Sequence, residues 1–294
     1  MSNKIGIYFA YWTHEWDGDF IYYINKVARL GFDTLEICPA NLVDMSVQER
    51  RKIKKAADDA GIDLTYCIGI PGQYDIASEN KETQRAGVDY QKKLIDVVNS
   101  MDGEYIGGIL YSCWPGAFTA GITDKSAFWD RSVENMKKIA GYAEKNGVTL
   151  CMEVVNRFEQ ILLNQAYEAV QYCKDVDSPS CRILLDAFHM NIEEDDFIEA
   201  IKTAGSYLSH FHIGETNRKT PGMGKMDWDS ICKGLNAVGY TGHIVMEPFV
   251  KMGGTVGGDI KIWRDLSGSC DERGLDKMAE GACAFIRRKL EENR

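Results

Sequence analysis

The stretch ADDAGIDLTY, residues 57–66, carries the pattern that decides the fold: a helix-like segment, a glycine and then a short strand-like run. The same order recurs in ARLGFDTLEI (residues 28–37) and AEKNGVTLCM (residues 143–152). Glycine favours the left-handed backbone with which helices commonly end, so each stretch predicts a helix that leads into a strand. A weak repeat of roughly 30 to 45 residues of this kind is typical of βα units in a parallel sheet.

Eight strand-like runs can be counted along the chain, and segments of helical periodicity separate them. Two of these segments, residues 46–61 and 132–147, open with a serine suited to an N-cap and close with glycine. No GxGxxG turn follows the first run and no Pro-, Gly- or Ser-rich linker divides the chain, so an open dinucleotide-binding sheet is disfavoured. The expected strands are Lys4–Trp12, Asp33–Cys38, Asp63–Gly69, Tyr105–Tyr111, Thr149–Val155, Arg182–His189, Leu208–Gly214 and Gly242–Pro248.

The sequence therefore predicts an α/β fold, a single (β/α)8 TIM barrel domain over residues 1–294. Its C-terminal helix, around residues 279–292, is expected to pack outside the last strands. The hydrophobic share of 45% and the charged share of 27% are those of an ordinary globular protein with ample material for a core.

Charge and targeting signals narrow the function classes. The net charge of -10 disfavours nucleic acid as a partner, because affinity for a phosphate backbone comes from clustered lysine and arginine. A small neutral or cationic substrate fits better. Residues 1–12 lack the features of a signal peptide and no apolar run is long enough to span a bilayer, so we expect a cytoplasmic protein without a membrane partner.

The nine cysteines contain no CxxC pair, which argues against a disulfide framework and against a zinc–thiolate site. Several lie inside apolar strand-like runs, where a cysteine usually packs as a small hydrophobic residue. We therefore expect structural thiols.

Four consecutive expected strands each end near a residue that can bind a metal: Glu153, Asp186, His212 and Glu247. In a TIM barrel the active site lies at the C-terminal ends of the strands, so these side chains are functional candidates. An isolated acid at a strand end is often only an N-cap or a loop ion pair, but four on adjacent strands favour a metal site. Carboxylate and imidazole ligands without thiolate suit manganese, magnesium or cobalt better than zinc.

The other histidines near this set have simpler interpretations. His210 lies two residues before His212, so both side chains point to the same side of the strand. We interpret His210, one layer deeper, as a hydrogen-bonded interior residue, with support of the metal site as the alternative. His243 begins the eighth strand, far from the catalytic end, and is expected to be structural.

Longer motifs follow the same strand ends and carry a resemblance to a known family. The chain resembles the ketose 3-epimerases, the family of D-tagatose 3-epimerase and D-psicose (allulose) 3-epimerase, over nearly its whole length. The motifs are GIYFAYW (residues 6–12), GGILYSCWP (107–115), MEVVNRFE (152–159), LLDAFHMNIEE (184–194), HFHIGETNR (210–218), VMEPFVKMGG (245–254) and IKIWRD (260–265).

The resemblance implies a barrel with a divalent ion, most often Mn(II), with Mg(II) or Co(II) as alternatives, held by Glu153, Asp186, His212 and Glu247. It implies that Glu153 and Glu247 exchange the proton on carbon 3 of a ketose through a metal-stabilised cis-enediolate, because inversion needs an acid/base group on each side of the sugar. D-Fructose/D-psicose and D-tagatose/D-sorbose are examples of such pairs. A homodimer or homotetramer is also implied.

Further residues match substrate-binding positions of the family. Glu159, His189 and Arg218 would contact the sugar's oxygens, while Tyr8, Phe9, Trp114 and Phe249 would shape the pocket. Cys67, together with Cys38, departs from the glycine or small residue typical of the family and would face the far end of the sugar. The preferred ketose is therefore open.

Two glycine-rich stretches, PGMGK (residues 221–225) and MGGTVGGD (residues 252–259), superficially resemble phosphate cradles. The first lacks P-loop spacing, and we interpret both as glycine-permitted loop bends. Three other functions stay open: an aldose–ketose isomerase, a multi-metal DNA-repair endonuclease on a related barrel, and a sugar-binding barrel without turnover. The few histidines and the negative charge oppose the endonuclease.

Overall fold

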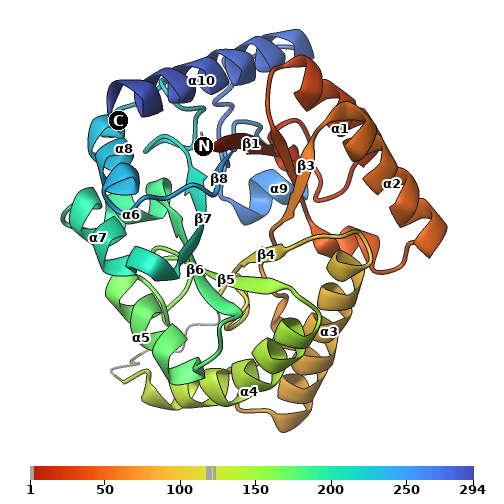
Figure 1. Ribbon diagram of the computed structural model, residues 1–294, viewed down its shortest axis with the longest axis vertical. Coiled ribbons are helices and arrows are strands. Elements are labelled where there is room, and N and C mark those ends of the chain that lie inside the picture. Colours follow the sequence, from red (N-terminus) through yellow and green to blue (C-terminus); the bar gives the residue numbers. More distant parts are fainter. Residues whose placement is uncertain (1–2, 117–120, 122–123) are drawn as a thin grey trace.

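The computed structural model describes residues 3–116, 121 and 124–294, and these form a ring of helices around a central parallel sheet (Figure 1). The alternation of strand and helix predicted from the sequence is confirmed. The strands are β1 (Lys4–Tyr8), β2 (Thr34–Ile37), β3 (Asp63–Tyr66), β4 (Tyr105–Gly108), β5 (Thr149–Val154), β6 (Cys181–Asp186), β7 (Leu208–Ile213) and β8 (His243–Met246).

The eight strands are hydrogen-bonded in the order β3-β2-β1-β8-β7-β6-β5-β4, and every pair is parallel. Beyond the end of β3, a single bridge between Cys67 and Gly107 joins the two outer strands. The Ile68 amide donates to the Gly107 carbonyl at 3.1 Å and the Ile70 amide to that of Ile109 at 3.3 Å. This β3/β4 seam makes the sheet a nearly closed barrel, as the sequence predicts.

Gly108 allows the two backbones of the seam to approach. Its φ is +116°, and a Cβ at this position would lie 2.1 Å from the Ile68 carbonyl oxygen. Any other residue would therefore push β4 away from the end of β3.

Most of the helices lie outside the strands, whereas the short helix Gly254–Asp259 lies over one end of the barrel (Figure 1). They are α1 (Phe20–Arg29), α2 (Val47–Ala60), α3 (Lys81–Asn99), α4 (Ser126–Lys145), α5 (Ala166–Val176), α6 (Ala187–Glu193), α7 (Phe197–Ala204), α8 (Trp228–Ala237), α9 (Gly254–Asp259) and α10 (Glu272–Glu292). Short 3-10 turns cover Phe9–Tyr11, Pro39–Leu42, Gly72–Tyr74 and Gly205–Tyr207. No helix among the described residues combines the length and apolar character needed to cross a membrane.

Ser46 and Ser132 were each expected to cap the N-terminus of a helix. Ser46 caps α2 in a reciprocal capping box with Glu49, and Gly61 ends the helix with φ +67°, as predicted. The prediction for Ser132 is wrong, because α4 begins at Ser126 and Ser132 lies buried in its middle. There its hydroxyl donates to the Tyr111 carbonyl at 2.5 Å, so it packs the helix onto the barrel instead of starting it.

The C-terminal helix, expected outside the last strands, joins the last part of the barrel to the first. Helix α10 lies against β1 and α8, between the last and the first units (Figure 1). Its Glu272 and Asp276 pair with Lys26 of α1, whose side chain is fully buried, and the Asp276 contact is 3.0 Å. The helix therefore fastens the end of the chain to its beginning.

Most strands are shorter than predicted, because the chain turns at the catalytic end before its apolar pattern stops. The first strand ends at Tyr8, where the 3-10 turn begins. The sixth ends at Asp186, whose carboxylate accepts from the Phe188 amide at 2.7 Å and caps α6. His189, expected in the strand, thus lies in a helix.

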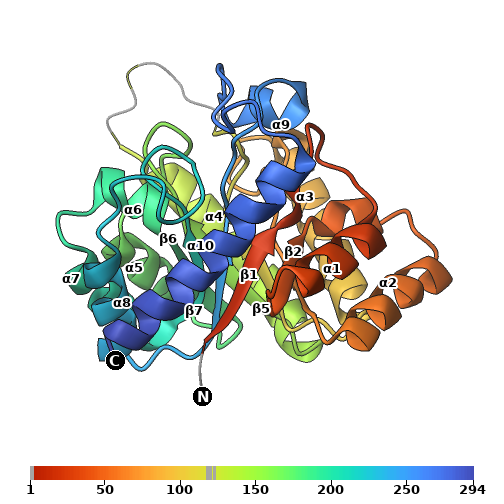
Figure 2. The same ribbon diagram turned by 90° about the horizontal axis from the view of Figure 1, so that it is seen from above.

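Helix α9 lies over the C-terminal end of the barrel, opposite the first described residues and the C-terminus (Figure 2). The loop after β1 holds it there: the Val256 amide donates to the His14 carbonyl at 3.0 Å and Thr255 to the Glu15 carboxylate at 2.7 Å. The Trp16 indole donates to Asp259 at 2.7 Å. Helix α9 and the loop after β1 together form one side of the cavity described below.

Candidate active site

Four strand ends bring the expected ligands together. Glu153 of β5, Asp186 of β6, His212 of β7 and Glu247, directly after β8, each offer one atom within 4.8 Å of the others. Register explains the meeting, because Asp186 lies opposite His212 and His212 opposite Val245. All are buried except Glu247, which is partly exposed.

Two atoms of this cluster show that it fits a divalent cation. Within the described residues, Asp186 Oδ2 and His212 Nδ1 are buried without a hydrogen-bond partner. His212 Nδ1 lies 3.7 Å from Glu153 Oε1 and 3.9 Å from Glu247 Oε1, too far for hydrogen bonds but suitable around an ion. Buried polar atoms normally find partners, so a hard divalent ion with oxygen and imidazole ligands suits this gap.

The charge of the cluster supports the same conclusion. Burial raises the pKa of Glu247 well above its ordinary value; the attraction of His212 acts against this, and repulsion from Glu153 adds to it. A divalent cation relieves such crowding and favours the ionised carboxylates.

His189 points its ring nitrogen Nε2 at this cluster. The Asn156 amide donates to His189 Nδ1 at 3.2 Å, so Nδ1 acts as an acceptor and Nε2 carries the hydrogen. Nε2 lies 3.6 Å from Asp186 Oδ2 and 3.9 Å from Glu153 Oε1. The ring can therefore donate a hydrogen bond to a ligand beside the four carboxylate and imidazole groups.

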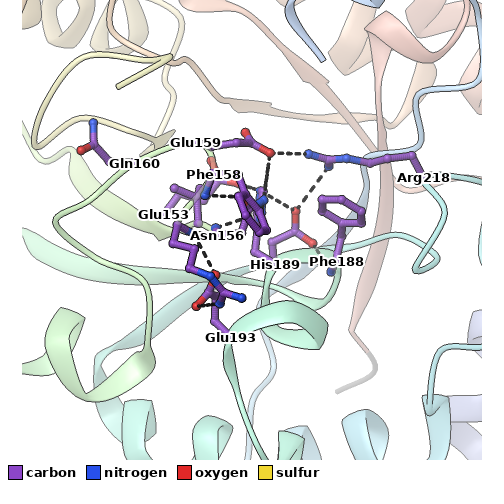
Figure 3. Close-up of polar contacts among 12 residues, drawn as sticks. Glu153, Asn156, Phe158, Glu159, Gln160, Phe188, His189, Glu193 and Arg218 are labelled. Carbon is purple, nitrogen blue, oxygen red and sulfur yellow. Dashed lines mark hydrogen bonds and ion pairs between the residues drawn. The ribbon is translucent and has the colours of Figure 1, made fainter. Parts of the chain in front are cut away.

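Arg218 and Glu159 form the rim beside His189 (Figure 3). The Arg218 guanidinium stacks 3.7 Å from the Phe188 ring centroid and contacts Glu159 Oε1 at 3.3 Å and Glu247 Oε2 at 3.4 Å. Burial opposes ionisation of Glu159, but the Arg218 guanidinium and hydrogen bonds from the Trp114 indole and the Asn156 side chain outweigh it and hold the pKa of Glu159 below its ordinary value. The rim therefore keeps a fixed cation beside a fixed anion.

A cavity of about 340 Å³ opens above the cluster. Glu153, Glu159, His189, Arg218 and Glu247 line its polar side. The remaining wall is mostly apolar, with Tyr8, Trp16, Trp114, Phe249, Cys38 and Cys67 among its members. Asp186 and His212 are absent from this lining and lie beneath it, among the buried groups of the cluster.

Phe9 has a different position from the one expected. The described cavity lining contains Tyr8 but not Phe9, which is fully buried. Its ring packs edge-on against Phe20 and lies 6.1 Å from that of Tyr23. Its ring also meets that of Tyr8 edge-on, with the ring centroids 5.1 Å apart, so Phe9 supports Tyr8 from behind.

The sulfur atoms behave as expected of small apolar groups. Eight of the nine cysteines are buried, and Cys270 is exposed. Burial raises the pKa of Cys67 well above its ordinary value and that of Cys38 to about 11, so both thiols stay neutral in the cavity wall.

Sequence reasoning missed several residues of this region. Trp16 lines the cavity from the loop after β1, Asn41 from a 3-10 turn and Asp259 from the end of α9, and none of them carries a strand-end signal. Glu36 is fully buried inside the barrel, 2.7 Å from His212 Nε2. The available signal was an acid inside the apolar run DTLEIC, which an interior charge with partners explains better than a surface strand.

The structure also tests the predictions for the two remaining barrel histidines and the two glycine-rich stretches. His210 Nε2 lies 3.0 Å from Glu36 Oε2, and His243 bonds Asp63 at the opposite end of the barrel at 3.0 Å. In PGMGK, the Gly222 amide donates to the buried Glu215 carboxylate at 2.6 Å. This loop wraps a carboxylate of its own chain, and MGGTVGGD forms α9.

Comparisons with known proteins agree with this geometry. A family model described as a xylose isomerase-like TIM barrel matches residues 24–266. The chain is 46% identical over 288 residues to the D-psicose 3-epimerase of Ruminiclostridium cellulolyticum, with 98% of each chain covered. It is 46% identical over 284 residues to the D-psicose 3-epimerase of Agrobacterium fabrum, with 97% of this chain and 98% of that one covered.

A solved structure gives the same result. The crystal structure of D-psicose 3-epimerase with D-tagatose from Clostridium cellulolyticum H10 matches with a TM-score of 0.95 and 46% identity, over 98% of this chain and 99% of that one. Fold and strand-end cluster thus define a xylose isomerase-like TIM barrel enzyme. Within that class, the chain belongs to the ketose 3-epimerase family.

Proposed function

We propose that the protein catalyses the metal-dependent epimerisation of free ketoses at carbon 3, as between D-fructose and D-psicose or D-tagatose and D-sorbose. The observation that carries this proposal is the pair Glu153 and Glu247, two carboxylates of one buried cluster that both face a cavity of about 340 Å³. The printed names of the relatives support the same reaction.

The cluster residues Glu153, Asp186, His212 and Glu247 would hold the ion, which we propose to be Mn(II), with Mg(II) or Co(II) as alternatives. When bound, such an ion supplies a positive charge that polarises the sugar oxygens on carbons 2 and 3 and stabilises the negative charge of the enediolate.

The two glutamates divide the proton transfer. One carboxylate removes the hydrogen of carbon 3, the electron pair of the broken C–H bond forms the C2–C3 double bond of the cis-enediolate, and the π pair of the C2 carbonyl moves onto its oxygen. The other carboxyl returns a proton to the opposite face of carbon 3, which inverts it. The roles exchange when the opposite epimer is the substrate, so each glutamate serves as base for one epimer.

The rim residues orient the reacting end of the sugar. His189 Nε2 and the Arg218 guanidinium are donors to its oxygens, and Glu159 both accepts from a hydroxyl and holds Arg218. Tyr8, Trp16, Trp114 and Phe249 offer apolar faces to the carbon skeleton, and Cys38 and Cys67 bound its far end.

Substitution of the two glutamates tests the proposal. We expect E153Q and E247Q each to lower the rate of D-fructose/D-psicose interconversion by about 10²- to 10⁴-fold, because a general acid/base contributes this much. Sugar binding, measured by calorimetry, should survive in part. The matched control is E134Q, because Glu134 pairs with Lys138 on the exposed surface of α4 and should leave the rate unchanged.

A product analysis separates this reaction from its neighbours. The metal-loaded enzyme is incubated with a panel of ketohexoses and ketopentoses, and the products are resolved by chromatography. Carbon-3 epimers support the proposal, whereas an aldose product would show an aldose–ketose isomerase. Sugar binding with every substrate unchanged would show a barrel without turnover. The same panel measures the preferred ketose.

Two further expectations stay predictions. A homodimer or homotetramer can be tested by measuring the mass in solution, and a cytoplasmic location by fractionating cells.

A further inference from the structure

Glu36 is a buried carboxylate that the proposed proton transfer does not use. It lies on β2 with its neighbours Tyr8 on β1 and Thr65 on β3, and its side chain is completely inaccessible. A charged group buried to this extent requires partners, since an unpaired one is very costly.

The partners of Glu36 are the two histidines of β7. Glu36 Oε1 lies 2.7 Å from His212 Nε2 in a hydrogen bond, although 176 residues separate the two in the chain. Glu36 Oε2 lies 3.0 Å from His210 Nε2, a close contact that is not aligned as a hydrogen bond. The directional interaction of the carboxylate is therefore with His212.

This hydrogen bond decides which nitrogen of His212 faces the cluster. A carboxylate only accepts, so Nε2 carries the hydrogen and donates it to Glu36. In the neutral ring that binds a metal, Nδ1 then presents its lone pair on the side of Glu153 and Glu247, where the described residues give it no hydrogen-bond partner. A carboxylate on the far nitrogen is the arrangement that orients histidine ligands and raises their basicity.

We propose that Glu36 is a positioning residue of the metal centre: its carboxylate fixes the tautomer and ring orientation with which His212 offers Nδ1 to the ion. The proposal rests on the proposed function, because it assumes the metal. It adds a fifth side chain, from the opposite part of the barrel wall, to the four ligands of β5 to β8. His210 supports the second oxygen of the same carboxylate from one layer deeper.

The test measures metal binding directly, without turnover. Mn²⁺ is titrated into metal-free wild-type protein and into E36Q, and binding is followed by calorimetry and by the electron paramagnetic resonance of free Mn²⁺. Glutamine keeps the size of the side chain but removes the charge that holds the Nε2 hydrogen. We expect Mn²⁺ affinity to fall by about 10- to 100-fold.

A second buried carboxylate provides the matched control. Glu215 is buried to the same degree, and its carboxylate accepts from the Gly222 and Met226 amides and the Trp228 indole, in a loop outside the cluster. E215Q should lower the melting temperature and leave the Mn²⁺ affinity unchanged. Equal affinities for wild type and E36Q would overturn the role of Glu36 alone. Wild-type protein that binds no Mn²⁺ would overturn the metal-dependent function together with it.

A measurement on the wild type serves if E36Q does not fold. In the Mg²⁺-loaded, ¹⁵N-labelled protein, long-range correlation spectra report which nitrogen of each imidazole carries hydrogen. We expect hydrogen on Nε2 of His212 and none on Nδ1. Hydrogen on Nδ1 of His212 would overturn the proposal.

Discussion

Arg218 shows how a single side chain can combine several constraints. Its backbone has φ +62°, a left-handed conformation, and its amide and carbonyl are both held, by the Glu215 carbonyl at 2.9 Å and by the Phe249 amide at 2.9 Å. Its planar guanidinium stacks on Phe188 while it contacts two carboxylates. Only a planar, multidentate cation meets all these contacts.

Replacement of Arg218 by lysine should therefore impair catalysis although the charge is kept. We expect kcat/KM of R218K to fall by about 10- to 100-fold, since hydrogen bonds to charged groups contribute about 1.5–3 kcal/mol each. Steady-state kinetics on D-fructose measure the effect. In the control R182K, the arginine over the Tyr207 ring lies at the start of β6, away from the cavity, and near wild-type kcat/KM is expected. A wild-type value for R218K would contradict the role of Arg218.

At this scale the sequence predicts the members of the buried cluster better than the residues that support them. Glu153, Asp186, His212 and Glu247 could be found because each follows an apolar run and barrels place such residues at one end. The roles of Glu36 and Asn156 could not, because they depend on partners in distant segments, His212 and His189; the run DTLEIC indicates only that Glu36 is buried. The spacing of residues along the chain does not indicate such contacts between distant segments.

At the scale of elements, the positions of helices and strands were predictable and their ends were not. The Ser46 N-cap and Gly61 were found because their signals are local. The end of β6 was missed because the pattern RILLDAFH stays apolar through the turn, and the capping bond of Asp186 is what stops the strand. Ser132 was misread because a serine can also bond a carbonyl across a packing interface.

Helix α9 depends on a glycine at its contact with the loop after β1. Gly254 has φ +67°, and a Cβ there would lie 2.1 Å from the His14 carbonyl oxygen. G254A should therefore displace α9, which carries Asp259 into the cavity wall. We expect KM for D-fructose to rise and stability to fall by about 1–3 kcal/mol, measured by kinetics and denaturant unfolding.

Gly258 offers a control within the same helix. A Cβ at Gly258 meets nothing within 4 Å and its backbone is not left-handed, so G258A should leave KM near the wild-type value. Equal kinetics for G254A and wild type would mean that the contact of α9 with the loop does not shape the cavity.

For the whole molecule, the β3/β4 seam is the least supported part of the barrel wall. A single bridge joins these strands, whereas the other neighbours pair along ladders of several residues. The cavity touches both sides of the seam, through Ile68 just after β3 and Ile109 just after β4. A sugar in the cavity therefore packs across the seam and should hold it closed.

Hydrogen exchange can detect this effect. With sugar at about 100 times its Kd, we expect exchange of the Ile68 and Ile70 amides to slow by up to about 100-fold. The Asp63 amide, which bonds the Asp33 carbonyl at the other end of β3, should respond less. The measurement uses mass spectrometry or NMR on the Mg²⁺-loaded protein. Equal slowing at both ends of β3 would indicate global stabilisation instead.

The fastening of α10 onto the first unit has a consequence for how the protein is made. On the ribosome, α1 emerges long before α10. Lys26 therefore lacks its ion-pair partners Glu272 and Asp276 while most of the chain is still being translated. During that interval β1 also lacks its neighbour β8. The nascent chain can form local βα units early, but the first of them can reach its native environment only as the last helix leaves the exit tunnel.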